Sequence, residues 1–574
     1  MILPPAAQDP VTGLFLVGAL SVVALVFNYF YYAYQYHKAQ RGREESQLPP
    51  KYPTWLPYVG SAIPYLRDGP EFLRKVTSYA GQLTSIRVTF LPGWDIYFFQ
   101  DRHTIREIWK KSNLMKSVSL RIFFYRYIFG MPQRSVAMYY EDDSGPFPKP
   151  YPGTSVPPEK RIHHTLYEGT HQALAGSGFN PTLQRFRAAL LARVASMGFA
   201  EDWAEMEDFQ RLILHTTGQS FVEAIFGPSL LRLSPTFMDD LKEFNRAVPL
   251  FAKATPRFLI PHAYAARQKM HNHLKRWYAY AREHFDESSI GADGDADPFW
   301  GSAWMRHRQK TLDKIQDDDT LAASDLGAAW GSVVNLVPST IMALVHILRD
   351  ESVHQRVMQE IEQSVGDRPL ADIDVKALSE NQLLSSIYAE TLRLHVKLNT
   401  VISSQRADLK LGRWWLPRGS IGLVNSHISH MDAAFWNTKQ GAHPVERFWA
   451  DRFLRDPADP LSGPINPAYR ETQGLGDAKA HVKEEETARD GPYFSMEGLE
   501  ESWVPYGGGH LVCPGRFLAK SAIMFTCVLF LREFEVELLS EVGELCSSNF
   551  GIGTEEPKRP VKFRIRRRLG REDR

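Results

Sequence analysis

A long run of uncharged and mostly apolar residues lies near the start of the chain. Residues 12–34 contain no Asp, Glu, Lys or Arg. As a helix, these 23 residues reach about 34 Å, enough to cross a bilayer. Lys38, Arg41 and Arg43 follow, and positive charge beside a span stays on the cytoplasmic side. We therefore predict an uncleaved anchor in residues 1–36 with a single span at about 12–34; a buried core helix is the alternative.

Apolar residues recur every three or four positions through much of residues 160–400, as amphipathic helices require. The pattern is clear over 183–197 and 341–365. Shorter strand-like runs lie at 86–99 and 401–424. The predicted fold class is therefore mainly α, an α+β, helix-rich globule with small β-sheets.

Two segments interrupt this pattern. Residues 37–60 are basic and rich in proline, which fixes backbone φ and favours an extended chain, so we expect a linker there. Residues 455–500 are polar and without periodicity, which is typical of an exposed insertion. The remaining chain, residues 61–574, is predicted to form one large domain that contains this insertion.

The composition narrows the functions to be considered. The 574 residues include 67 Lys and Arg against 66 Asp and Glu, a formal net charge of +1 at pH 7. Binding to nucleic acid usually needs a clear positive excess, so we expect no nucleic-acid partner. The only cysteines are Cys513, Cys527 and Cys546, too few for a disulfide framework and wrongly spaced for a zinc site. Any cysteine chemistry must therefore use a single thiol.

Cys513 stands in a glycine-rich loop directly ahead of an apolar helical run that continues to residue 531. Three glycines, Gly507, Gly508 and Gly509, permit backbone conformations closed to other residues and let N–H groups approach a ligand. The start of a helix carries partial positive charge, which we expect to lower the pKa of the Cys513 thiol. A thiolate in this position can ligate a metal; a buried structural cysteine is the alternative.

This loop resembles the haem-binding signature of the cytochrome P450 family, in which an aromatic residue, glycines and Cys-x-Gly precede a long helix. The resemblance implies the cytochrome P450 fold, haem b as the cofactor, and Cys513 as the axial ligand of the haem iron. It also implies that Gly507 and Gly509 belong to the haem-binding loop. Leu511 stands where the family usually has an Arg or His that meets a haem propionate, and His510 is the candidate replacement.

Two further motifs follow in the order that the family shows. Glu390 and Arg393 lie three residues apart on one predicted helix face, where their side chains can pair. The resemblance implies that these two and Arg452 form a buried ion network with a structural role. Arg406, in the strand after that helix, resembles the family's haem-propionate arginine.

The predicted helix over 326–349 resembles the helix that crosses the haem on its oxygen side. Gly331 would let haem or oxygen approach the backbone. The acidic residue and Thr that relay protons in most members are absent, and Asn335 is the candidate oxygen-side polar residue. Asn335 followed by Pro338 is similar to the branch with the sterol 7α- and 12α-hydroxylases and prostacyclin synthase. Because Pro338 removes a helical hydrogen bond, we expect a break near Val334.

The resemblance, which is to fungal members of the family, implies a haem-thiolate monooxygenase. Such an enzyme would oxidise a small lipophilic substrate, such as a terpenoid, a steroid-like molecule or another secondary metabolite. It would use O2 and electrons from NADPH through cytochrome P450 reductase, with cytochrome b5 as a further candidate partner. Because no nicotinamide or flavin fingerprint follows a strand, the chain should not reduce itself. The implied location is the endoplasmic reticulum membrane, single-pass, with the catalytic domain in the cytosol and the lipid bilayer as a partner.

Two alternatives follow from the missing acid–Thr pair. A redox-independent isomerase or dehydratase of the same family would act on an oxygenated substrate without NADPH or reductase. A non-catalytic haem-binding protein would load haem and leave any lipophilic ligand unchanged.

One segment and one set of arginines bear on substrate access and on docking of a redox partner. Residues 244–264 are apolar, aromatic and interrupted by prolines, which favours a lid that dips toward the bilayer, with core packing as the alternative. Four arginines are candidates for a basic face that docks an acidic reductase, with an ordinary solvated helix face as the alternative. These are Arg161, Arg185, Arg187 and Arg193.

Overall fold

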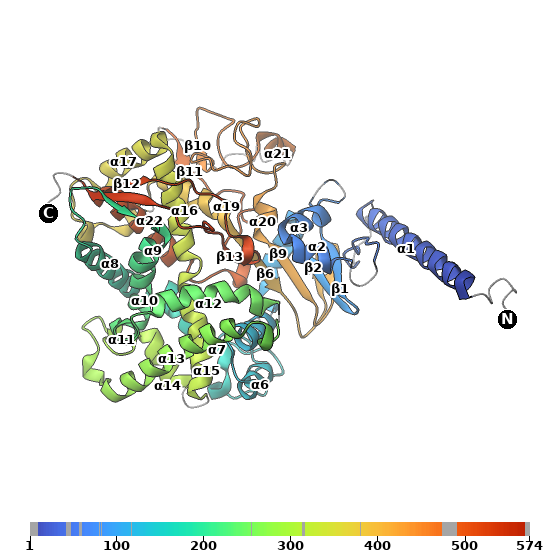
Figure 1. Cartoon of the computed structure of the whole chain (residues 1–574), viewed down its shortest axis with the longest axis horizontal. Helices are drawn as coiled ribbons and strands as arrows, with labels where there is room; N and C mark the ends of the chain where they lie inside the picture. The colour runs from blue at the N-terminus through green and yellow to red at the C-terminus, as the bar shows by residue number, and fades with distance from the viewer. Residues whose placement is uncertain are drawn as a thin grey trace. The chain divides into compact units, whose positions relative to one another are not determined.

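Helices dominate the computed structural model (Figure 1). It describes residues 10–41, 47–56, 60–79, 81, 83–115, 118–253, 255–312, 316–378, 380–472 and 491–568. Contacts divide the chain into two units: unit 1 is Met1–Ser117, Asn399–Asp432 and Leu499–Leu511, and unit 2 is Val118–Leu398, Ala433–Gly498 and Val512–Arg574. The predicted fold class, helix-rich with small β-sheets, is confirmed.

The chain begins with one long helix, α1 (Pro10–Arg41), drawn in dark blue in Figure 1. Most of its large apolar side chains from Val11 to Phe27 are exposed, which is consistent with a membrane anchor. Asp318–Arg349 is also long and apolar enough to cross a membrane, but it is mostly buried. This second stretch is therefore a core helix of unit 2.

The last turns of α1 pack on other parts of unit 1. Asn28 Nδ2 donates a hydrogen bond to the Thr54 carbonyl at 3.1 Å. Tyr36 is fully buried, with its ring edge-on to Tyr79 at 4.8 Å between centroids. This packing extends the helix to Arg41, so the structure differs from the expected linker at 37–60 in its first residues.

The rest of unit 1 is a small sheet with short helices. β1 (Ile86–Leu91) and β2 (Trp94–Phe98) are antiparallel, β2 pairs in parallel with β9 (Ile421–Asn425), and β9 pairs with residues 399–402 of β6 (Val396–Ile402). The other elements are β7 (Leu409–Leu411), β8 (Trp414–Leu416), α2 (Ala62–Arg67), α3 (Gly69–Thr77), α4 (Arg102–Lys110) and α20 (Ser426–His430). Trp414, fully buried, is part of the apolar core of this unit.

Unit 2 holds most of the helices. They are α5 (Val118–Phe123), α6 (Gln133–Glu141), α7 (Ile162–Ala175), α8 (Phe179–Ser196), α9 (Phe209–Ile213), α10 (Gln219–Phe226), α11 (Pro228–Leu233), α12 (Phe237–Ala252), α13 (Pro261–His284), α14 (Ala303–Leu312), α15 (Asp318–Val333), α16 (Leu336–Arg349), α17 (Glu351–Val365), α18 (Val375–Leu378), α19 (Gln382–His395), α21 (Pro467–Thr472) and α22 (Arg516–Glu533).

The strands of unit 2 are short. β12 (Phe534–Leu538), β14 (Phe563–Arg567) and β3 (Ala204–Met206) form one sheet in that order, and β13 (Ile552–Thr554) pairs with residues 396–398 of β6. Two further pairs are β4 (Ala296–Asp297) with β5 (Gly301–Ser302), and β10 (Leu454–Arg455) with β11 (Tyr493–Phe494).

A broken helix forms the centre of unit 2. α15 ends at Val333 and α16 begins at Leu336, so the interruption falls at Val334 and Asn335. Pro338 explains it, because a proline ring has no N–H to donate to the carbonyl four residues earlier. α16 packs against α9, α17, α19 and α22 (Figure 1). The break predicted near Val334 is thus present.

Two local expectations differ from the structure. The helical pattern over 341–365 covers two helices, because Asp350 ends α16 and caps α17 by accepting a hydrogen bond from Val353 N at 3.1 Å. The described ends of the expected insertion, residues 455–472 and 491–500, are partly packed: β10 pairs with β11, and Ile465 and Leu499 are buried. Single apolar residues in a polar stretch leave no periodic signal. Residues 473–490 lie outside the described residues.

Candidate active site

Cys513 lies three residues before α22 in unit 2 and is exposed. Burial around its sulfur nevertheless raises the pKa of the Cys513 thiol, although the N–H groups of Gly515 and Arg516 and the Arg516 charge oppose this. The predicted lowering of this pKa is therefore wrong in its net direction. The helix start does favour the thiolate, but the surrounding protein outweighs it.

The other two cysteines have different surroundings. Cys527 is buried within α22, and burial raises the pKa of its thiol to about 12. Cys546 is partly exposed, with its sulfur 3.0 Å from Ser548 Oγ. Of the three, Cys513 alone is an exposed residue beside the start of a helix.

The glycine loop before Cys513 belongs to unit 1. Gly507 and Gly509 both have positive φ, +73° and +55°. A side chain at Gly508 would collide with the indole of Trp109, so the middle glycine of the loop is also required. His510 N donates to Ser112 Oγ at 2.8 Å, and the His510 side chain is exposed.

Trp109 is a further residue that the sequence reasoning missed. Its indole Nε1 is buried and has no hydrogen-bond partner among the described residues. A buried N–H group without a partner is costly, so this donor suits an acceptor supplied from outside the chain. No motif in the sequence marks it.

Arg406 was predicted to lie in a strand, and this prediction is wrong. Arg406 lies on an exposed bend after β6 in unit 1. The polypeptide leaves the sheet at Ile402, because the following Ser403–Asp408 stretch is polar. Arg406, Gly507, Gly509 and His510 belong to unit 1, whereas Cys513, Gly331 and Asn335 belong to unit 2.

Glu390, Arg393 and Arg452 lie together in unit 2, and all three side chains are fully buried. Glu390 Oε2 accepts from Arg393 Nε at 2.7 Å, and Glu390 Oε1 accepts from Arg452 Nε at 2.9 Å. Burial alone would raise the pKa of Glu390, but the two guanidiniums hold it below its ordinary value. The Arg452 guanidinium also donates hydrogen bonds to the carbonyls of Asn437 and Pro444. One carboxylate thus joins α19 to the segment before β10.

On the broken helix, Gly331 and Asn335 lie one turn apart. A side chain added at Gly331 would meet no atom within 4 Å, so open space lies beside it. Asn335 Oδ1 accepts hydrogen bonds from Thr554 N at 2.9 Å and Thr554 Oγ1 at 3.0 Å. A Cβ at Gly553 would lie only 3.0 Å from the same oxygen. The break is therefore tied to β13 through the amide oxygen of Asn335, and no sequence motif marks Thr554 for this role.

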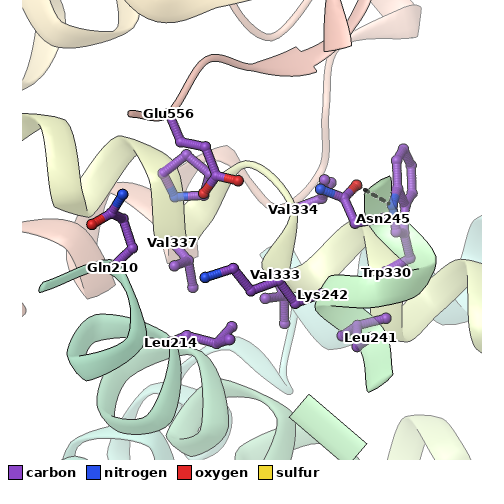
Figure 2. A pocket seen from close by; sticks show the side chains of 11 residues that line it. Gln210, Leu214, Leu241, Lys242, Asn245, Trp330, Val333, Val334, Val337 and Glu556 are labelled. Atoms are coloured by element: carbon purple, nitrogen blue, oxygen red, sulfur yellow. Dashed lines mark hydrogen bonds between the residues drawn. The ribbon is translucent and has the colours of Figure 1, made fainter. Parts of the chain in front are cut away.

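A small pocket lies beside the helix break (Figure 2). Its walls come from α9 and the π-helix that follows it (Leu214–Gly218), from α12, from α15 and α16, and from the chain after β13. The lining residues are Gln210, Leu214, Leu241, Lys242, Asn245, Trp330, Val333, Val334, Val337, Pro338 and Glu556. Most walls are apolar, and Trp330 Nε1 is satisfied by Asn245 Oδ1 at 2.9 Å. Lys242 and Glu556 are the charged side chains at its lining.

All four arginines that were candidates for a basic docking face are engaged by groups of their own unit. Arg161 is buried and donates to the carbonyls of Phe147 and Pro148. Arg185 pairs with Asp295 at 2.7 Å, and Arg193 pairs with Glu223. Arg187 donates to the carbonyls of Leu370 and Ala371. These cations are used inside the unit, which a count of charge along the sequence does not reveal.

The residues present fit a haem-thiolate group. An accessible thiol stands where two backbone N–H groups favour its thiolate, as required of a metal ligand. Gly331 borders open space on the helix that the family places on the opposite side of the group. Among the described residues, no cluster of His, Cys, Asp and Glu offers an alternative metal site.

Comparison with known proteins agrees with this arrangement. Residues 231–563 match the family Cytochrome P450. The chain is 30% identical to cytochrome P450 monooxygenase fsoE of Humicola fuscoatra over 97% of this chain and 94% of that protein. It is 20% identical to cholesterol 7-alpha-monooxygenase of Cricetulus griseus over 92% of this chain and 95% of that protein. It is 27% identical to 5-beta-cholestane-3-alpha,7-alpha-diol 12-alpha-hydroxylase of Sus scrofa over 42% and 44% of the two chains.

The chain therefore belongs to the cytochrome P450 family, and it is a cytochrome P450 monooxygenase. The predicted family, its fold and the distant similarity to sterol hydroxylases are confirmed.

Proposed function

We propose that this monooxygenase binds haem b through Cys513 and hydroxylates or otherwise oxidises a small lipophilic molecule, a terpenoid, a steroid-like compound or another secondary metabolite. The observation that carries the proposal is the accessible Cys513 thiol at the start of α22. Similarity to a fungal monooxygenase and to two sterol hydroxylases supports the lipophilic substrate class.

Haem, when bound, supplies oxygen activation, which a thiolate ligand favours by donating electron density. The Cys513 thiol must lose its proton to act as this ligand. The N–H groups of Gly515 and Arg516 favour the thiolate and temper its electron donation. Glu390, Arg393 and Arg452 hold α19 and the following segments in place and have a structural role.

On the oxygen side, Asn335 replaces the usual proton-relaying pair. Its amide oxygen is occupied by Thr554, and no described residue bonds to its amide NH2 group. Asn335 is therefore oriented to donate hydrogen bonds, which can hold an oxygen atom of a ligand or a water. An amide does not release a proton near neutral pH, so Asn335 positions and another group must supply protons.

We infer that electrons come from NADPH through cytochrome P450 reductase, with cytochrome b5 as a further candidate donor, at the cytosolic face of the endoplasmic reticulum. The exposed apolar part of α1 supports membrane attachment. Between α12 and α13, Phe258 and Leu259 are 79% and 61% exposed. These side chains suit contact with the bilayer, from which a lipophilic substrate would enter.

A second candidate is the redox-independent isomerase or dehydratase, because Asn335 is held as a donor and lacks an acidic neighbour on its helix. The deciding experiment incubates microsomes that contain the full-length protein with lipophilic substrates under ¹⁸O2, with and without reductase and NADPH. Labelled product that requires both supports the monooxygenase. Unlabelled product without NADPH identifies the isomerase or dehydratase, and haem loading with no product under any condition identifies a non-catalytic haem protein.

A further inference from the structure

One side of the interrupted helix in unit 2 borders free space. Four residues recur at intervals of three and four and therefore lie on this side: Ala328, Gly331, Ser332 and Asn335. Gly331 is exposed and the other three are half-buried, whereas residues 329–330 and 333–334 between them are buried. A Cβ at Gly331 would meet no atom within 4 Å. These small residues therefore face a space that a ligand can enter rather than a packed neighbour.

Asn335 has its hydrogen-bond acceptor occupied and its donor free. The backbone N–H of Thr554 can only donate, so the Asn335 atom 2.9 Å from it is the oxygen Oδ1. The Thr554 hydroxyl donates to the same oxygen at 3.0 Å, which uses both of its lone pairs. The NH2 group is then on the side of the amide away from Thr554.

The Asn335 NH2 group is also within reach of a ligand. No described residue accepts a hydrogen bond from Asn335 Nδ2, and this nitrogen is not among the buried polar atoms that lack a partner in the described part of the chain. A side-chain nitrogen without a partner that is absent from that set is open to solvent. Asn335 therefore presents a fixed donor that water fills until a ligand replaces it.

The other residues on this side of the helix offer no charge and no further side-chain donor. Ala328 and Gly331 have no polar side-chain atoms. The hydroxyl of Ser332 donates to the carbonyl of Ala329 at 2.8 Å, so its proton is used. A carboxylate placed here would gain no counter-charge from these residues, and burying it unpaired would be costly. The face suits a neutral, mostly apolar molecule with one hydrogen-bond acceptor.

We propose that the substrate is a neutral lipophile that already carries an oxygen atom, and that Asn335 binds this oxygen through its NH2 group while the carbon skeleton lies beside Gly331. The proposal rests on the monooxygenase function and narrows its substrate class to ketones and other molecules with an uncharged oxygen acceptor. Thr554 holds the amide before the ligand arrives, so little conformational freedom is lost on binding.

The first test measures ligand binding to the full-length, haem-loaded protein in lipid nanodiscs, followed by the change in haem absorbance. The probes are two pairs that differ by one carbonyl: menthone with menthane, and androstanone with androstane. The measured quantity is the ratio of the hydrocarbon Kd to the ketone Kd. In at least one pair this ratio should fall about fivefold from wild type to Asn335→Asp, the affinity equivalent of one net hydrogen bond. An unchanged ratio in both pairs, or binding of neither ketone to wild type, would overturn the proposal.

Asn335→Asp is chosen because it keeps the oxygen that Thr554 holds and replaces the NH2 group by a second oxygen. Asn335 also precedes α16, and a helix start favours the ionised carboxylate, which repels a ketone oxygen. The matched control is Asn245→Asp on α12, where Oδ1 accepts from Trp330 Nε1 at 2.9 Å. It should keep the wild-type ratio, and an equal fall in this control would overturn the assignment to Asn335.

The second test observes the carbonyl itself. With ¹³C-labelled ketone bound to the haem-loaded protein, the infrared C=O stretch should lie at lower wavenumber in wild type than in Asn335→Leu, because an accepted hydrogen bond weakens the C=O bond. The same band position in both proteins would overturn the proposal.

A third variant tests where the skeleton lies. Gly331→Val fills the free space beside the helix and should weaken ketone and hydrocarbon alike, with the ratio of their Kd values unchanged. Undiminished binding of both ligands would contradict the placement of the skeleton beside Gly331.

Turnover separates failure of this proposal from failure of the monooxygenase function. Reductase-dependent incorporation of ¹⁸O into the hydrocarbons as readily as into the ketones would overturn the substrate class alone. A ketone preference that depends on Asn335, without labelled product under any condition, would overturn the monooxygenase function and leave the recognition by Asn335 standing.

Discussion

The amide oxygen of Asn335 accepts both the backbone N–H and the hydroxyl of Thr554, at 2.9 and 3.0 Å. This pair joins the interrupted helix to β13, 219 residues further along the chain. It also fixes which end of the Asn335 amide remains free to act on a ligand.

Thr554→Val should weaken this hold, because it removes the hydroxyl donor and keeps the backbone one. A buried hydrogen bond of this kind contributes about 1 kcal/mol, so the unfolding free energy should fall by about that amount in denaturant titrations. Thr554→Ser, which keeps the hydroxyl, should lose less than half as much. Product regiochemistry should change in the Val variant alone, since a single hydrogen bond then holds the Asn335 amide.

Replacing Cys513 tests the haem ligand directly. Cys513→Ala should abolish the thiolate Soret band of the reduced carbon monoxide complex, because no other described thiol combines exposure with a helix start. Cys527→Ala and Cys546→Ala are the controls and should retain the band. Retention of the band in Cys513→Ala would reject the assignment.

Breaking the buried ion network should be costly. Glu390→Gln leaves two buried guanidiniums without a counter-charge, and loss of one partner from such a cluster typically costs about 3–5 kcal/mol. The measurement is guanidinium-induced unfolding of the haem-loaded protein. Asp451→Asn breaks the partly exposed pair with Arg356 nearby and should cost less than about 1 kcal/mol. Equal losses of unfolding free energy in the two variants would contradict a structural role of Glu390.

Because α1 packs on the rest of unit 1, two neighbouring tyrosines of this helix should contribute unequally to the free energy of unfolding. Tyr36 is fully buried against Tyr79, whereas Tyr34 is 65% exposed. Tyr36→Ala should lower the unfolding free energy by about 3 kcal/mol, as loss of a buried aromatic ring does, and Tyr34→Ala should have little effect. Protease accessibility of residues 47–56 should rise only in the Tyr36 variant.

The pH dependence of stability should differ in sign between two glutamates. Glu556 has a raised folded pKa, so its stabilising contribution is complete below the ordinary value of 4.5 and is lost as the pH rises through the folded value. Glu544 has a pKa lowered by Lys558, so its contribution is present above 4.5 and is lost as the pH falls. Glu556→Gln should therefore gain stability relative to wild type from pH 4.5 toward neutrality. Glu544→Gln should show the reverse trend.

Much of this arrangement could be predicted from the sequence where the determinants are local. Pro338 indicates the helix break because a missing N–H acts within one turn. The cysteine loop and the order of Glu390, Arg393 and Arg452 indicate the family because each motif is short and carries its own chemistry.

The features that were not predicted all depend on distant segments. Thr554 meets Asn335 only through the pairing of β13 with β6, and nothing near either residue records that contact. The partners of the arginines considered for a basic face also lie on distant segments. Arg193, for example, forms an ion pair with Glu223 on another helix. The thiol pKa of Cys513 rises because burial by the folded chain exceeds the local effect of the helix start.

The buried ion network also ties completion of this core to protein synthesis. Arg452 lies 62 residues after Glu390, which a ribosome adding about 5–20 residues per second needs roughly 3–12 s to reach. Until then, Arg393 is the one member of the network that can pair with Glu390, and that pair is neutral. The guanidinium of Arg452 adds a second positive charge to the network. It donates hydrogen bonds to the carbonyls of Asn437 and Pro444. The three-residue network therefore cannot be complete before both segments of the chain have been synthesised.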